Sequence, residues 1–269
     1  MTLTKQPIIR INKYSLPSAY LNRTVRVVFY YPPAFGNQGK ASLLLINDGQ
    51  DMEKLSLEDI LSRLYRQNLI RPVFCAAIFC GEDRKNEYGT AGISDYKGRG
   101  AKAGLYTRFI LEELLPFIDK ENKGIAFVEK SFAGFSLGGL SALDIVWNHS
   151  DVFSKAGVFS GSLWWRSKGL DEGYVEDRDR IMHAQIRAGV YHKGLKFFFE
   201  TGTLDETCDR NNNGIIDSID DTLGLIDELV QKGYNKRSDI KYLELKDGKH
   251  DVATWARAMP EFLKWGWGK

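Results

Sequence analysis

The sequence predicts an α/β fold, with a mostly parallel central sheet and helices on both of its faces. Strand-like and helix-like segments alternate along the chain, which is typical of parallel sheets wrapped by helices. Central segments such as residues 43–46 are apolar without interruption, as expected for strands covered on both faces. The chain shows no internal repeat, low-complexity tract or long linker, so we expect residues 1–269 to form a single domain.

The strands are predicted from short β-leaning or apolar runs. In chain order they are residues 24–31, 42–47, 73–79, 125–135, 156–160, 196–200 and 240–245. The helices are predicted from apolar residues that recur at helical spacing. They are residues 57–67, 105–117, 137–147, 221–231 and 252–265. Ligands of such sheets bind beyond the carboxyl ends of the strands, so polar motifs at those ends are candidate site residues.

Composition and charge exclude several classes of partner. The 269 residues are 43% hydrophobic and carry a net charge of +2, as in an ordinary globular protein. This charge gives no electrostatic basis for binding nucleic acid or anionic membranes.

No apolar run approaches the roughly 20 residues that span a bilayer. Residues 1–7 lack the apolar region of a secretory signal. We therefore expect a cytoplasmic protein if Met1 is the native start, and an extracytoplasmic one stays open if the N-terminus was processed. The sequence does not indicate an oligomeric state.

The three cysteines predict neither a disulfide framework nor a zinc site. Cys75 and Cys80 lie in the apolar run of residues 73–80 and are interpreted as small buried thiols. On one extended strand they are too far apart to pair with each other. Together with Cys208 they do not show the spacing of zinc ligands.

The segment Gly134-Phe135-Ser136-Leu137-Gly138 has the pattern G-x-S-x-G. It lies where a predicted strand should turn sharply into a predicted helix. A serine at such a corner projects its hydroxyl above the sheet, and the glycines allow the strained backbone and the close approach of strand and helix. We predict that Ser136 is a catalytic nucleophile.

A nucleophilic serine needs a histidine base and an acid that orients it. His250 follows the predicted strand 240–245 through a turn at residues 246–249 and precedes the last helix, so we expect it to be the base. Asp205 follows the strand 196–200 and is the expected acid. Glu206 and Glu200 are alternatives for that role.

The other three histidines are not expected to be catalytic, because they do not follow a strand end. They are His149, His183 and His192.

An oxyanion hole needs two preorganised backbone donors. The amide of Leu137 should supply one, because it follows the nucleophile at a helix N-terminus. The second should come from the loop after the strand 42–47, and the amide of Gln50 is expected to supply it. The amide of Asp51 is the alternative.

On these motifs the chain resembles the esterase D-like esterases of the α/β-hydrolase superfamily. This group includes siderophore, feruloyl and acetylxylan esterases, S-formylglutathione hydrolases and mycolyltransferases. The resemblance extends from about residue 24 to residue 265 and rests on residues 45–50, 84–88, 109–118, 134–139, 159–165, 202–205 and 250–255. It implies an α/β-hydrolase fold and a triad of Ser136, Asp205 and His250. The formylglutathione hydrolase loop of the H-G-L-T-C type is absent, since Asp48-Gly49-Gln50-Asp51 stands in its place.

Three further residues are candidates for binding a substrate. Arg84 follows a strand end and is expected to bind an anionic or hydroxyl-rich acyl group, or alternatively to pair with Glu87 and hold the loop. Trp164 and Trp165 follow the strand 156–160 and are expected to include a pocket wall, although both are also compatible with a place in the core.

Residues 209–220 fit the twelve-residue loop of an EF-hand. Such a loop places oxygen ligands at alternate positions around a calcium ion and glycine at its sixth position. The expected ligands are Asp209, Asn211, Asn213, the carbonyl of Ile215, Asp217 and Asp220. Because aspartate replaces the commoner glutamate at the twelfth position, we expect modest affinity and a structural role beside Asp205. The alternative is a surface loop rich in turn-forming residues.

These motifs predict a serine carboxylesterase that acts on a small-molecule ester and needs no organic cofactor. One alternative is an acyltransferase with the same triad, in which an alcohol competes with water. A second alternative is a non-catalytic, calcium-dependent carbohydrate-binding protein on a hydrolase scaffold, which the complete set of three triad residues disfavours.

Overall fold

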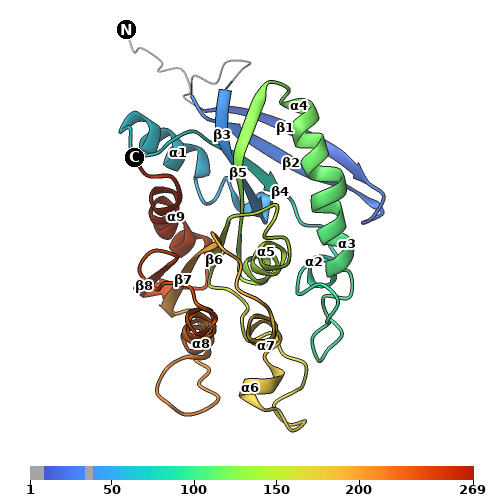
Figure 1. Ribbon diagram of the computed structural model, residues 1–269, viewed down its shortest axis with the longest axis vertical. Coiled ribbons are helices and arrows are strands. Elements are labelled where there is room, and N and C mark those ends of the chain that lie inside the picture. Colours follow the sequence, from blue (N-terminus) through green and yellow to red (C-terminus); the bar gives the residue numbers. More distant parts are fainter. Residues whose placement is uncertain (1–8, 34–38) are drawn as a thin grey trace.

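The computed structural model describes residues 9–33 and 39–269. Within them a single sheet of eight strands has the order β1-β2-β4-β3-β5-β6-β7-β8 (Figure 1). The strands are β1 (Arg10–Ser18), β2 (Arg23–Tyr31), β3 (Gly39–Asn47), β4 (Val73–Ile78), β5 (Ile125–Phe135), β6 (Lys155–Phe159), β7 (Lys196–Leu204) and β8 (Ile240–Lys249). The pairs β1–β2 and β2–β4 are antiparallel. All other neighbours are parallel, which confirms the predicted sheet.

The helices lie on both faces of this sheet (Figure 1). They are η1 (Gly49–Asp51), α1 (Leu57–Arg66), α2 (Arg84–Glu87), α3 (Ala103–Arg108), the π-helical η2 (Phe109–Leu114), α4 (Leu115–Glu121), α5 (Leu137–Asn148), α6 (Glu176–Asp179), α7 (Ile181–Ala188), α8 (Asp217–Lys232) and α9 (Val252–Trp267). Helices α1 and α9 contribute apolar residues to one buried cluster, and α3, α4, α5, α7 and α8 contribute to the other.

The central strands explain why the core has two halves. Leu43 and Leu45 of β3 belong to one cluster, whereas Leu44 and Ile46 belong to the other. All four side chains are fully buried. Successive side chains of a strand point to opposite faces, so an uninterrupted apolar run is what a strand covered on both faces requires.

The structure differs from the predicted elements most clearly in the following places. Strand β1 was not predicted, because it is an edge strand with many polar, partly exposed side chains. Helix α7 was also not predicted; its eight residues are short and mostly polar. Residues 246–249, predicted as a turn, continue strand β8. Helix α8 begins at Asp217 rather than at residue 221.

The cysteines are free thiols, so the prediction that Cys75 and Cys80 do not pair is confirmed. Cys75 is buried in β4, but Cys80 is only partly buried. The prediction of a buried thiol at Cys80 is therefore wrong, because β4 ends two residues earlier, at Ile78.

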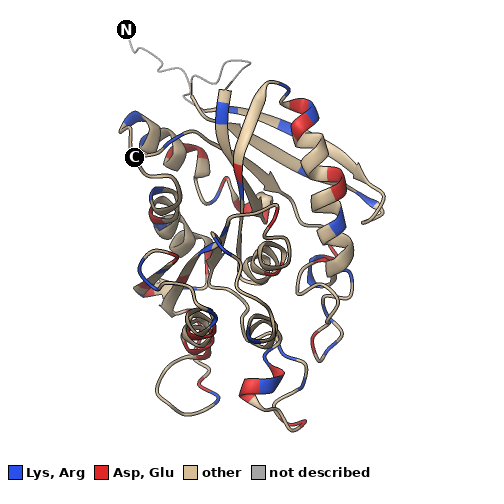
Figure 2. Ribbon diagram, in the orientation of Figure 1, with Lys and Arg blue, Asp and Glu red and all other residues tan. Residues whose placement is uncertain are grey.

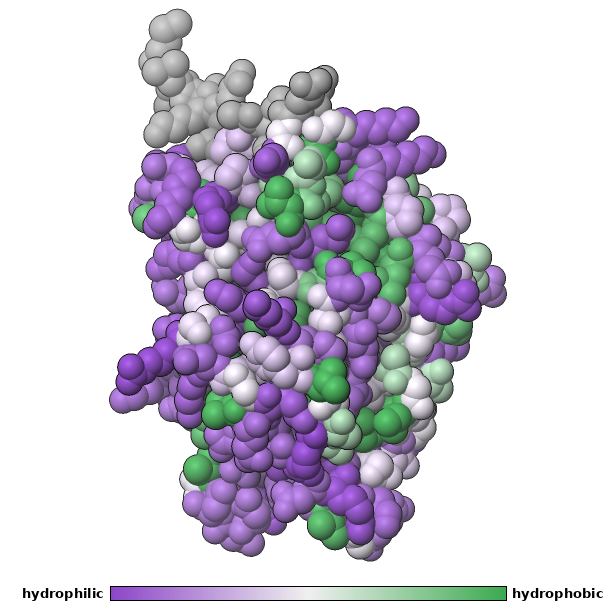
Figure 3. Space-filling view, in the orientation of Figure 1, coloured by the Kyte–Doolittle hydropathy of each residue, from purple (hydrophilic) through white to green (hydrophobic). Residues whose placement is uncertain are grey.

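The surface carries both signs of charge. Lys and Arg are interspersed with Asp and Glu along helices and loops (Figure 2). The face in Figure 3 is largely hydrophilic, with hydrophobic side chains between the polar ones. Among the residues that the structure describes, no helix has the length and hydropathy of a membrane span.

Candidate active site

Ser136 stands at the corner between β5 and α5. Its backbone has φ 53° and ψ −123°, a conformation that L-residues rarely adopt, and Leu137 begins the helix directly after it. Gly134 and Gly138 meet behind this corner: a Cβ atom on Gly134 would lie 2.2 Å from the carbonyl oxygen of Gly138. The glycines of the motif are therefore required by the close approach of strand and helix.

The neighbouring strand holds the corner in place. The Ser136 amide donates a hydrogen bond to the carbonyl of Phe159 at 2.8 Å, and the Ser136 carbonyl accepts one from the Ser162 amide at 3.1 Å. The two side-chain hydroxyl oxygens of Ser136 and Ser162 lie 3.4 Å apart. The Ser136 side chain is only partly buried, so its hydroxyl is accessible.

His250 lies between the end of β8 and the start of α9. Asp251 caps this helix by accepting a hydrogen bond from the Thr254 amide at 2.9 Å. The residue is exposed as a whole, but its ring packs edge-on against Trp255, with ring centroids 5.5 Å apart. This partial desolvation lowers the pKa of His250 below its usual value, and the negative charge of Asp205 opposes that effect. The charge of each of these two groups therefore affects the pKa of the other.

Asp205 follows the end of β7 and is partly buried. Its Oδ1 accepts a hydrogen bond from the Ser160 hydroxyl at 3.2 Å, and this hydroxyl in turn accepts one from Trp255 Nε1 at 3.0 Å. Its Oδ2 is buried and has no partner among the described residues. Burial raises the pKa of Asp205, and the positive form of His250 opposes the rise.

Strands β7 and β8, which carry Asp205 and His250, approach each other unusually closely at their carboxyl ends. Their pairing is irregular between Gly202 and Leu204. A Cβ atom on Gly202 would lie 2.4 Å from the carbonyl group of Gly248. Two glycines thus fix the spacing of the strands that carry the predicted acid and base.

Within the described part of the chain, no hydrogen bond joins His250 to Ser136 or to Asp205. Catalytic hydrogen bonds often form or tighten only when the substrate binds. The roles of the three residues therefore remain predictions.

Of the alternative acids, Glu200 lies inside β7 and is fully buried, and Glu206 lines a neighbouring cavity.

The other histidines make contacts outside this group. His183 is fully buried, with Nε2 2.8 Å from the Asp221 carbonyl oxygen. His192 Nδ1 lies 2.9 Å from the Ser150 hydroxyl. His149 follows the end of α5.

The two predicted oxyanion donors have no acceptor in the described residues. Neither the Leu137 amide nor the Gln50 amide is used by the backbone or by a side chain. The alternative donor, the Asp51 amide, already donates to the Asp48 carbonyl at 3.0 Å. The side chain of Gln50 is held by the segment after β4, because its Oε1 accepts a hydrogen bond from the Cys80 amide at 3.2 Å.

Asp48 and Arg84 form a buried ion pair behind this loop. The guanidinium Nε and Nη2 each lie 2.7 Å from a carboxylate oxygen of Asp48, whose side chain is 2% exposed. A Cβ atom on Gly138 would lie 2.6 Å from the same carboxylate, so the pair joins the oxyanion loop to the elbow. The alternative in which Arg84 pairs with Glu87 is wrong, since Glu87 accepts both hydrogen bonds from Arg23.

Replacing Arg84 with methionine is expected to destabilise the protein by about 3 kcal/mol, because it leaves the buried Asp48 charge without a cationic partner. The urea midpoint of unfolding measures this change. Lys264→Met is the matched control, since its pair with Glu261 is exposed on α9 and should contribute at most about 1 kcal/mol. Equal midpoints for the two variants would contradict the anchoring role of Arg84.

Trp164 and Trp165 have different surroundings. Trp165 is fully buried and packs against Gly89 and Gly100, where a Cβ atom would lie 2.9 Å from its ring. Trp164 lines a cavity of about 540 Å³ together with Arg166. Of the two tryptophans, only Trp164 faces a space that a ligand can enter.

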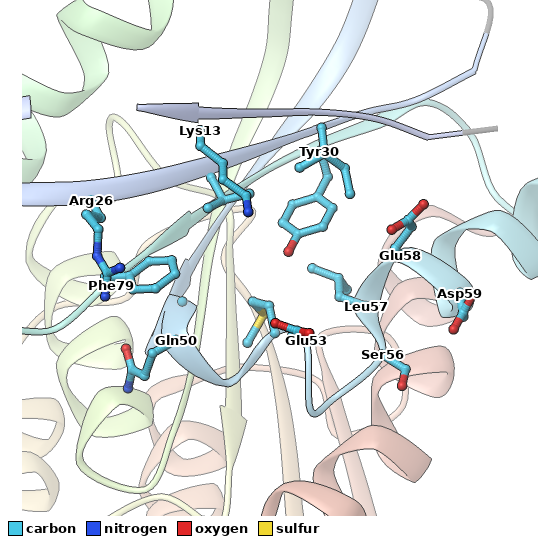
Figure 4. A pocket seen from close by; sticks show the side chains of 14 residues that line it. Lys13, Arg26, Tyr30, Gln50, Glu53, Ser56, Leu57, Glu58, Asp59 and Phe79 are labelled. Atoms are coloured by element: carbon cyan, nitrogen blue, oxygen red, sulfur yellow. The ribbon is translucent and has the colours of Figure 1, made fainter. Parts of the chain in front are cut away.

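A second cavity, of about 510 Å³, is lined in part by Gln50. It separates β1 and β2 from η1 and the start of α1 (Figure 4). Lys13 and Tyr30 point into it from the strands, and Arg26 stacks on Phe79 at 4.5 Å. The predicted oxyanion loop thus has a cavity beside it.

The calcium-type loop is closed by its own side chains. Asp220 accepts hydrogen bonds from the side-chain amides of Asn211 at 2.9 Å and Asn213 at 3.1 Å. Asp209 accepts from the Gly214 amide at 2.9 Å. These two carboxylates and two amides form a donor set that suits a hard cation.

Asp217 is turned away from this ring. Its Oδ1 accepts from the Arg210 amide at 2.9 Å and faces the Arg210 guanidinium at 3.2 Å. Across residues 9–33 and 39–269, no group of three His, Cys, Asp or Glu side chains forms a metal site. The loop therefore fits a cation only with its asparagine oxygens, and calcium binding stays a prediction.

A family model described as "Putative esterase" matches residues 18–265. The chain belongs to this esterase family. Ester-bond chemistry is therefore the activity class of the protein, and the family expected from the motifs is confirmed.

The chain is similar to several known proteins. Protein YjcH of Bacillus subtilis is 25% identical over 256 residues, which are 92% of this chain and 93% of YjcH. The enterobactin esterase FES of Shigella flexneri is 19% identical, with a TM-score of 0.72 over 97% of this chain and 60% of FES. The siderophore hydrolase EstB of Aspergillus nidulans is 15% identical, with a TM-score of 0.70 over 98% of this chain and 97% of EstB. These similarities confirm the α/β-hydrolase fold.

Sequence reasoning did not assign a role to Ser160, Trp255 or Asp48. Ser160 and Asp48 each directly follow a strand, β6 and β3, and both have a positive φ. Their position at a strand end is the signal that the sequence offered.

Proposed function

We propose that this esterase is a serine carboxylesterase in which Ser136 is the nucleophile, His250 the general base and Asp205 the acid. The backbone of Ser136 supports this proposal most directly. Its strained φ of 53° places a partly exposed hydroxyl at the start of α5, next to a Leu137 amide that has no acceptor in the described residues. Strain of this kind is found where a side chain must be presented for chemistry.

In the first half of the reaction, the Ser136 hydroxyl oxygen bonds to the carbonyl carbon of the ester while His250 takes its proton. Asp205 Oδ2, which is buried and unpaired, accepts the other imidazole N–H and holds the ring in the required tautomer. The negative oxygen of the tetrahedral intermediate receives hydrogen bonds from the amides of Leu137 and Gln50. The proton on His250 then passes to the leaving alcohol, and an acyl-Ser136 remains.

In the second half, His250 takes a proton from water, whose oxygen attacks the acyl carbon. The bond from that carbon to the Ser136 oxygen then breaks, His250 returns the proton to this oxygen, and the carboxylic acid is released. The same acyl-enzyme transfers its acyl group to a sugar or another alcohol where that acceptor outcompetes water. Product analysis with an added alcohol separates hydrolysis from transfer. The cavity beside Trp164 is the proposed site for the larger part of the small-molecule ester.

A short-chain p-nitrophenyl ester and a fluorophosphonate probe test the proposed function. We expect turnover of the ester and covalent labelling of a single serine, Ser136, identified by peptide mass spectrometry. An intact, folded protein that shows neither would instead support a binding protein on a hydrolase scaffold.

We also propose that the loop formed by residues 209–220 binds calcium and stabilises the segment that carries Asp205. Free calcium at 100 times Kd is expected to add about 2.7 kcal/mol of stability, so a chelator should lower Tm by several degrees together with activity. Asp220→Ala should melt at the same temperature with and without calcium. Identical melting of the unmodified protein under both conditions would defeat the idea.

A further inference from the structure

A second carboxyl group, that of Glu200, lies near Asp205. Its side chain is fully buried, and its Oε1 has no hydrogen-bond partner among the residues that the structure describes. Its Oε2 lies 3.5 Å from the Ser160 hydroxyl, which also lies 3.2 Å from Asp205 Oδ1. A single hydroxyl group therefore stands between two carboxyl groups.

The hydrogen bonds available to Ser160 restrict how these groups can be protonated. A serine hydroxyl has one hydrogen to donate and two lone pairs that accept. One lone pair receives Trp255 Nε1–H at 3.0 Å. If Glu200 is protonated, it donates to the second lone pair and the Ser160 hydrogen is directed to Asp205. If both acids are ionised, they compete for one hydrogen, and two negative charges face each other in a buried space.

The surroundings of Glu200 favour its acid form. Burial raises the pKa of Glu200 to about 8, the negative charge of Asp205 contributes to the rise, and Arg257 of α9 opposes it. From β8 the neighbouring titratable group is Tyr242, whose hydroxyl lies 2.7 Å from that of Thr201. Glu200 has no salt bridge in the described chain, and a pKa raised to about 8 favours its protonated form at neutral pH.

We propose that Glu200 is a positioning residue that acts in its protonated form. It directs the Ser160 hydroxyl to Asp205 Oδ1 and so keeps Asp205 Oδ2 aimed at the imidazole of His250. This inference rests on the proposed triad and adds a fourth group to it. Because the proton is lost as the pH rises through 8, the orientation of Asp205 should be lost over the same range.

The dependence of kcat/KM on pH, measured on both sides of pH 8, tests this role. The unmodified protein should show a decrease of activity on the alkaline side, with a midpoint near 8. Glu200→Gln keeps a permanent N–H donor toward Ser160, so it should retain neutral-pH activity within about threefold and lose the alkaline decrease. Glu200→Leu has no donor and should lose roughly tenfold or more at every pH, as when other supporting partners of catalytic groups are removed.

Asp144→Asn is the matched control. Asp144 is buried on α5, and burial raises its pKa to about 6, but its partners are the Ala91 amide and the side chains of Gln185 and Asn148. This variant should keep the unmodified pH profile. Circular dichroism establishes that each variant is folded, and Glu200→Gln decides the question alone if Glu200→Leu does not fold.

Fluorophosphonate labelling of Ser136 separates the two levels of inference. Labelling together with an unchanged alkaline decrease in Glu200→Gln would overturn the role of Glu200 alone. Equal activity of the Gln and Leu variants across the pH range would overturn it as well. An unmodified protein that is not labelled would overturn the triad, and the role of Glu200 with it.

Discussion

Replacing Ser136 with alanine is expected to abolish fluorophosphonate labelling and to lower kcat by about 10⁴-fold to 10⁶-fold. In the proposed mechanism this hydroxyl forms the acyl-enzyme, and the Ser162 hydroxyl 3.4 Å away does not stand at the strained corner before α5. The fold should be unaffected, because alanine keeps the Cβ atom and leaves the hydrogen bonds of the residue 136 backbone to Phe159 and Ser162 in place. Steady-state kinetics and Tm measure the two effects separately.

Ser154→Ala is the control for this variant. Its hydroxyl donates to the Lys130 carbonyl at 3.3 Å, outside the candidate site, so labelling and turnover should match the unmodified protein. Undiminished labelling of Ser136→Ala would place the nucleophile elsewhere.

Replacing His250 with alanine is expected to lower kcat by a similar factor, about 10⁴-fold or more, because proton transfer to and from Ser136 and the leaving group is lost. The residue is exposed and its ring makes an edge-on contact with Trp255, so far-ultraviolet circular dichroism should be unchanged. The double variant with Ser136→Ala should be no slower than either single variant, since residues that act as a unit are not additive.

His192→Ala provides the comparison for His250. His192 packs against Trp147 and lies beside the Ser150 hydroxyl, so its loss should leave kcat unchanged. Comparable losses in both histidine variants would show that the effect of His250→Ala is not specific to the site.

The sequence was sufficient for those parts of the fold that depend on local pattern. The buried run of residues 43–46 predicted a strand covered on both faces, and Leu43 to Ile46 are fully buried. The elbow at Ser136 was also predictable, because its glycines must follow one another at fixed spacing. Strand β1 was not, since an edge strand with one neighbour needs no strong apolar pattern.

Parts of the site that depend on distant pairs could not be predicted. Asp48 and Arg84 are separated by 36 positions, and linear order suggested Glu87 as the partner of Arg84. The bridge from Trp255 through Ser160 to Asp205 joins α9, β6 and the end of β7. Such contacts are set by the order of strands in the sheet and not by spacing along the chain.

The close approach of Gly202 and Gly248 has a consequence for how activity fails. It couples the segments that carry Asp205 and His250 to β8, which is the outermost strand on that side of the sheet. Ser136, in contrast, follows the central strand β5. Outer strands open at lower free energy than central ones. Mild denaturation should therefore abolish activity while most of the secondary structure persists, because Ser136 keeps its position while the proposed base, His250, is displaced.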